Sequence, residues 1–135
     1  MLLTHLDCLN LAHWLHNTAS EDGLSPLCFA LVDLYGELIW FERMDTAPAY
    51  HTPIAIAKAY TALRLECTTQ EFQQQLQNHQ WHPKDYMDPK LTAIAGGAPL
   101  YSIDGRLAGA IGICSHKTEH DQALADLAAM HFLSL

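Results

Sequence analysis

Apolar residues recur at the spacing of an amphipathic helix in four segments of this chain. The predicted helices run from Thr4 to about Asn17, from about Pro53 to Leu63, from Thr68 to about Asn78 and from Thr118 to about Phe132. Three of them begin with a threonine followed three residues later by an acid, as in a capping box: Thr4 with Asp7, Thr68 with Glu71 and Thr118 with Asp121. In the last helix the expected inner face is formed by Leu124, Leu127, Ala128 and Phe132.

Five shorter apolar runs predict strands, at residues 29–32, 37–43, 91–95, 100–103 and 106–114. Between the first two, Gly36 can adopt the positive φ of a tight hairpin and Asp33 can accept a hydrogen bond from its own backbone. Asp104-Gly105 predicts a two-residue turn in a second hairpin. The order of elements predicts an α/β domain of the α+β type, with a mostly antiparallel sheet packed with helices. Residues 1–135 are expected to form a single domain.

A series of short motifs, in one order along the chain, resembles a known family. The matching residues are Val32-Asp33, Gly36, Leu38, Phe41, Arg43-Met44-Asp45, Ala47, Ala55, Lys58-Ala59, Thr61-Ala62, Gly96-Gly97, Pro99-Leu100, Asp104-Gly105 and Gly109-Ala110-Ile111-Gly112-Ile113. They resemble the family of GlcG, the haem-binding protein HbpS and the C-terminal domain of PduO-type proteins. The resemblance implies a profilin-like, two-layer domain, haem as a cofactor, association into homo-oligomers and, for some relatives, haem degradation.

The charge and composition of the chain exclude several classes of function. A formal charge of −8 with only seven Lys and Arg residues argues against nucleic acid as a partner, because binding to phosphates needs clustered cations. No apolar run approaches the roughly 20 residues of a membrane-spanning helix, and no signal peptide is recognisable, so a cytoplasmic protein is expected. The four scattered cysteines are expected to be reduced and mostly buried.

His51 is the leading candidate for a ligand-binding residue. It follows Tyr50 in the segment between Arg43 and the helix of Lys58, and these four side chains surround one pocket if the segment folds over the end of the first hairpin. A haem site needs an axial donor, usually His, together with apolar walls and cations for the propionates. His51 is therefore the predicted iron ligand, and Arg43, Asp45, Tyr50 and Lys58 are the other candidates beside it.

A purely structural role for these residues stays open. Arg43 could pair with Asp45, and Lys58 with Asp33 or a backbone carbonyl. After the last strand, relatives have Ser-Gly-Gly in a region that the resemblance associates with ligand contacts, whereas this chain has Cys114-Ser115-His116-Lys117. His116 joins the candidates on this ground, and a ligand other than haem stays open.

The other histidines and the glycines do not form a recognised site. His13 and His16 share one helix face, and His79 and His82 lack the Cys or carboxylate partners of a zinc site. The glycines lack the pattern of a phosphate-binding loop and are expected to allow close packing of strands or of a helix on backbone. No nucleophilic triad is recognisable, so no catalytic residue is predicted.

These observations favour a small ligand-binding module. Its candidate ligand is haem or a related tetrapyrrole, in a pocket near the first hairpin. The alternatives are an oligomeric, non-enzymatic assembly protein without haem and a weak haem-degrading protein. Self-association is expected, because the first helix carries apolar residues on more sides than one core face needs, Leu2, Leu3 and Trp14 among them.

Overall fold

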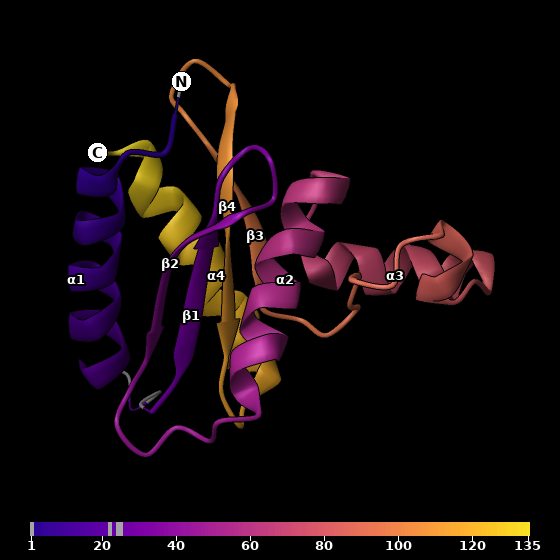
Figure 1. Cartoon of the computed structure of the whole chain (residues 1–135), viewed down its shortest axis with the longest axis horizontal. Helices are drawn as coiled ribbons and strands as arrows, with labels where there is room; N and C mark the ends of the chain where they lie inside the picture. The colour runs from indigo at the N-terminus through magenta and orange to yellow at the C-terminus, as the bar shows by residue number, and fades with distance from the viewer. Residues whose placement is uncertain (1, 22, 24–25) are drawn as a thin grey trace.

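The computed structural model describes residues 2–21, 23 and 26–135, and it contains four α-helices, a short 3-10 helix and four strands (Figure 1). In chain order the elements are α1 (His5–Glu21), β1 (Cys28–Val32), β2 (Leu38–Arg43), α2 (His51–Leu65), α3 (Thr69–His79), η1 (Pro83–Tyr86), β3 (Gly97–Tyr101), β4 (Leu107–Cys114) and α4 (Thr118–Leu133). The predicted α+β class, with an antiparallel sheet packed with helices, is confirmed.

The four strands form one antiparallel sheet in the order β2-β1-β4-β3. Each outer pair is a hairpin with a three-residue loop that ends in a glycine of positive φ, Gly36 at +79° and Gly105 at +83°. In the first loop Asp33 Oδ1 accepts hydrogen bonds from Tyr35 N and Glu37 N, as predicted. The two-residue turn predicted for Asp104-Gly105 is wrong, because Ser102 N donates to Arg106 O and the loop spans residues 103–105.

The sheet is the middle of three layers, where two were predicted. Alternate side chains of β1 point to opposite faces, as in any strand. Phe29 and Leu31 lie in a cluster with α1 and α4, whereas Ala30 and Val32 lie in a second cluster with α2. Figure 1 shows α1 and α2 on opposite sides of the strands. The contribution of α2 to this second cluster is made mainly of small side chains, Ala55, Ala59 and Ala62, together with Leu63.

Two local predictions are wrong because the residues concerned form tertiary hydrogen bonds instead of the predicted local ones. The apolar run 91–95 is not a strand; Thr92 N donates to Thr61 Oγ1, so the segment is fixed to α2 instead of pairing in the sheet. Thr118 and Asp121 do not form a capping box, since Asp121 is buried and bonds Ser115. The first helix extends to Glu21, beyond its predicted end near Asn17. Leu127 was predicted to lie on the inner face of the last helix, but it is 45% exposed.

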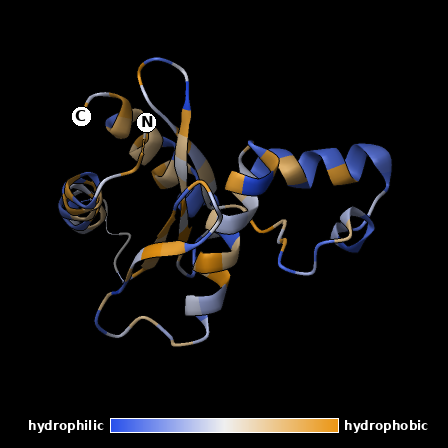
Figure 2. Ribbon diagram, turned by 45° about the horizontal axis from the view of Figure 1, so that its top comes forward, coloured by the Kyte–Doolittle hydropathy of each residue, from blue (hydrophilic) through white to orange (hydrophobic). Residues whose placement is uncertain are grey.

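An arm of α3 and η1 stands away from the three layers, and most of its residues are hydrophilic (Figure 2). The capping box predicted for Thr68 and Glu71 is confirmed at its start. The ring of Tyr86 packs edge-on against Phe72, with 5.0 Å between centroids, and lies 5.8 Å from that of Trp81. These rings hold the return segment of the arm against α3.

In the part of the chain that the structure describes, no helix is long and apolar enough to cross a membrane.

Candidate functional site

The first turn of α2 brings together four of the six candidate residues. Tyr50 and His51 lie at its start, Lys58 follows two turns later on the face toward the sheet, and His116 comes from the loop between β4 and α4. The rings of His51 and His116 are 4.9 Å apart, and those of His51 and Tyr50 are 4.5 Å apart, both edge to face. Arg43 and Asp45 lie at the end of β2.

Glycine allows α2 to lie directly on the sheet at this position. A Cβ on Gly112 would be 2.1 Å from the Ala55 carbonyl oxygen and 2.5 Å from Ala59 N. A Cβ on Gly97 would be 2.5 Å from Lys58 O. The prediction that these glycines serve close packing of a helix on backbone is therefore confirmed, and the contact fixes where α2 directs His51 and Lys58.

His51 is buried, with 3% of its surface exposed, and its Nδ1 atom has no hydrogen-bond partner among the residues that the structure describes. Burial is the main cause that holds the pKa of His51 below its ordinary value, and the neighbouring His116 acts in the same direction. The charge of Asp121 opposes the shift and that of Lys58 adds to it. A neutral imidazole with an unused ring nitrogen is the form that can bind a metal or donate to a ligand. Sequence reasoning placed His51 in a loop; it is the first residue of α2.

Lys58 is completely buried and its ammonium has partners within the protein. Nζ donates to the Ile113 carbonyl at 2.7 Å and lies 3.5 Å from Asp121 Oδ2. The other bonds of this carboxylate come from Ser115, whose N and Oγ donate to it at 2.8 and 2.5 Å. The structural alternative is thus present, because Lys58 donates to a backbone carbonyl. Its carboxylate partner is Asp121, not Asp33. The cluster fixes the loop that carries His116.

Two buried polar residues that sequence reasoning missed extend this cluster. Gln122 Oε1 accepts from Gly96 N at 2.7 Å, and its Nε2 donates to Gly97 O at 3.0 Å. Thr69 Oγ1 accepts from Gly97 N at 2.9 Å. A glutamine inside an apolar helix pattern next to a Gly-Gly pair is the signal that could have indicated them.

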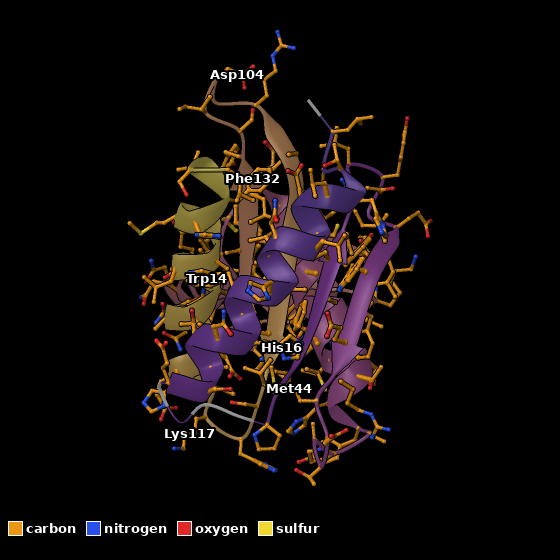
Figure 3. The ribbon with its side chains drawn as sticks, turned by 90° about the vertical axis from the view of Figure 1, so that its left-hand side faces the viewer. Trp14, His16, Met44, Asp104, Lys117 and Phe132 are labelled. Carbon is orange, nitrogen blue, oxygen red and sulfur yellow. The ribbon has the colours of Figure 1, made fainter. Side chains whose placement is uncertain are left out.

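Arg43 and Asp45 line a separate cavity of about 460 Å³. Arg43 Nη1 donates to Ala47 O at 3.1 Å, and the rest of its exposed guanidinium faces solvent. On the α1 side of this cavity, His16 Nε2 lies 2.7 Å from Glu42 Oε1. Figure 3 shows His16, Met44 and Lys117 at one end of the molecule, opposite Asp104 at the tip of the second hairpin. The candidates therefore share one end of the protein but not one cavity.

A larger cavity of about 640 Å³ lies at the other end of the first hairpin. Its walls include Tyr35 and Leu38 from the hairpin and Pro53, Ile56 and Tyr60 from α2. The Tyr60 hydroxyl donates to Asp88 Oδ2 at 2.5 Å, which fixes this ring. Sequence reasoning expected a pocket near the first hairpin; the structure has one at each end of it.

Arg43, Cys28 and Cys114 form a row on the face of the sheet under α2. Cys28 is directly opposite Arg43 on β2 and directly opposite Cys114 on β4. Both cysteines are buried, as predicted, and Thr52 of α2 hydrogen-bonds Cys28. Neither was predicted to belong to the site, because their pairing depends on strands that are far apart in the sequence.

Acidification is expected to destabilise the protein through His51. Because its pKa in the folded protein is lowered, the unfolded chain takes up a proton below about pH 6.5 that the folded chain does not. The free energy of unfolding therefore falls as the pH drops below this value. Urea unfolding at a series of pH values should show a shallower decline for His51→Phe than for the unchanged protein. Equal slopes would show that His51 takes up its proton in the folded state, and His13→Phe, at an exposed position of α1, is the control.

Comparison with known proteins places the chain among haem-associated relatives. A family model described as "Haem degrading protein HbpS-like" matches residues 3–130. A 15.0 kDa protein from the dhaT-dhaS intergenic region of Citrobacter freundii is 30% identical over 111 residues, 82% of this chain and 78% of that protein. The crystal structure of a PduOC–haem complex has a TM-score of 0.85 at 25% identity, with 96% of this chain and 94% of that chain covered. A double mutant of Streptomyces reticuli HbpS has a TM-score of 0.84 at 25% identity, with 97% and 87% covered.

Proposed function

Because the chain belongs to the HbpS-like family, we propose that it is a small-ligand-binding module of the cytoplasm that takes haem, or a related flat tetrapyrrole, at the start of α2. The observation that carries this proposal is the buried His51, whose Nδ1 has no hydrogen-bond partner in the described part of the chain. A buried polar atom without a partner is costly, and such atoms concentrate at functional sites. The haem in the PduOC complex supports the choice of ligand.

The residues at this end of the protein fit a haem group in part. His51 supplies a neutral imidazole, and His116 is an exposed second donor beside it. Arg43 and Lys117 are exposed cations that can meet propionates. Since His116 and Tyr50 cover the His51 ring, both side chains must turn outward before a ligand reaches it. When bound, haem would supply an iron centre whose remaining coordination position can take a further ligand.

Two candidates take other roles in this proposal. The ammonium of Lys58 is held by Ile113 O and Asp121, so Lys58 positions the His116 loop and does not meet the ligand. Asp45 lines the cavity beside Arg43, where its carboxylate would oppose a propionate and so restrict which way the ligand can lie.

Haemin titration of the purified apo-protein tests the proposal. A saturable Soret shift is expected for the unchanged protein, with affinity lowered roughly tenfold or more in His51→Ala, the size of effect expected for losing a metal ligand or its support. His120→Ala, an exposed histidine on the first turn of α4, is the matched control and should bind as before. No Soret shift, or the same shift in His51→Ala as in the control, would contradict the proposal.

Self-association is a second candidate role, favoured by the outer face of α1. Trp14 is not free for a partner, because its ring stacks on that of His131 of α4, with 5.0 Å between the ring centroids. Leu3 is buried, whereas Leu2, Leu6 and Leu9 are 68%, 65% and 46% exposed. Light scattering on the titration samples measures the mass of the particle in solution. A monomer that shows no Soret shift would contradict both haem binding and self-association.

A further inference from the structure

Cys28 and Cys114 face each other across the two central strands. They are direct partners in the antiparallel pairing of β1 with β4, and both lie in the cluster under α2. Met44 N donates to Leu27 O, one position before the Cys28–Arg43 pair, so Cys28 turns its own backbone groups toward β4. Cys28 and Cys114 are therefore a hydrogen-bonded pair, with Cα atoms about 5.5 Å apart. The Cα separation lies within the range of disulfides, roughly 4.4 to 6.8 Å, but the Cβ atoms of such a pair are also about 5.5 Å apart, so that a disulfide requires them to approach by about 1 Å.

The two thiols lie between cations. Arg43 acts on Cys28 from β2, and Lys58 acts on Cys114 from α2, where it also hydrogen-bonds the sulfur. Burial is the largest influence and raises the pKa of both thiols. Each cation lowers the pKa of its neighbouring thiol, while the charge of Asp121 raises that of Cys114. The thiols are thus mainly protonated near neutral pH, and they should react faster as the pH rises.

The other two cysteines lack this arrangement. Cys8 lies on α1 in the cluster on the opposite face of the sheet, and burial raises its pKa to about 11. Cys67 follows the end of α2 and is half-buried. Both serve as internal comparisons for the cross-strand pair.

We propose that Cys28 and Cys114 form a dithiol modification site, which a hydroperoxide converts into a disulfide between β1 and β4. One thiolate attacks the peroxide, the O–O bond breaks, and the products are a sulfenic acid and one molecule of water or alcohol. The second thiol then attacks the oxidised sulfur, which releases water and forms the S–S bond. Two protons and two electrons leave the protein in total, and the peroxide is reduced by two electrons.

Oxidation would change the surface on which α2 rests. The reduced thiols contact Thr52 and Lys58, from the first and third turns of that helix. A disulfide removes the S–H groups and draws the two sulfur atoms together on the face of the sheet that α2 covers. The oxidation does not depend on haem, so it can be tested apart from the proposed function.

The test uses a Cys8→Ser/Cys67→Ser variant, which keeps only the pair, and a matched Cys8→Ser/Cys67→Ser/Cys28→Ser variant without it. Each is exposed to hydrogen peroxide at neutral and alkaline pH, with glutathione treated in a parallel tube to verify oxidation. Remaining thiols are alkylated after unfolding, and peptides are mapped by mass spectrometry without reduction. We expect a linked Cys28–Cys114 peptide that dithiothreitol abolishes, forming faster at alkaline pH.

The disulfide should also raise the Tm of the pair-only variant by roughly 10 °C, because it closes a long loop. The variant without Cys28 should show neither the linked peptide nor the rise. The proposal is overturned if both cysteines are fully alkylated after peroxide treatment of the folded protein under conditions that oxidise the glutathione control. It is also overturned by a link found only between two chains on a non-reducing gel.

Discussion

Replacing Gly112 with alanine should lower the free energy of unfolding by about 3 kcal/mol or more. The added Cβ would lie 2.1 Å from the Ala55 carbonyl oxygen and 2.5 Å from Ala59 N, and both neighbours are backbone atoms of α2. Backbone cannot turn aside as a flexible side chain can, so the whole helix must move off β4. Urea unfolding followed by circular dichroism measures the loss, and His51 should become more exposed with it.

Gly105→Ala is the matched control for this substitution. Gly105 has a positive φ of +83° but nothing within 4 Å of the added Cβ, so its change carries only the backbone cost of about 1 kcal/mol. A Gly112 variant as stable as the Gly105 variant would show that α2 does not rest on the sheet backbone.

Replacing Lys58 with methionine should cost a similar amount, about 3 kcal/mol or more, for an electrostatic reason. Methionine fills most of the space of the lysine stem but leaves the Asp121 carboxylate buried without its cation. The Ile113 carbonyl loses its buried donor in the same change. Thermal and urea unfolding both measure the effect.

A double-mutant cycle separates the ion pair from general damage. Asp121→Asn should recover part of the loss when combined with Lys58→Met, because it removes the unpaired charge. Lys84→Met, at an exposed position of η1, should change stability by less than about 0.5 kcal/mol. Additive losses for Lys58 and Asp121 would mean that the two side chains do not interact.

Features that depend on neighbouring residues could be predicted from the sequence. The capping bonds of Thr4 with Asp7 and of Thr68 with Glu71 join residues three apart, and both are present. The turn at Asp33 and the close packing at Gly112 were also predicted, since few other residue types suit such positions.

Features that depend on distant contacts could not be predicted in this way. Asp121 has the spacing of a cap residue, but Lys58 and Ser115 bind its carboxylate in the folded protein. Of the candidate site, His116 was a candidate only through the resemblance, so its contact with His51 was not predicted, and neither was the burial of His51. The Cys28–Cys114 pair requires the register of β1 against β4, which no local pattern contains.

The strand order also determines how this chain can fold. Each outer hairpin, β1 with β2 and β3 with β4, closes a short loop and can form early. Joining them requires residues 28–32 to meet residues 110–114, with α2 and the arm between them in the sequence. This closure loses much chain entropy before its contacts repay it. The central pairing of β1 with β4 is therefore expected to limit the folding rate, and the two hairpins are expected to exist before α2 can settle on the sheet.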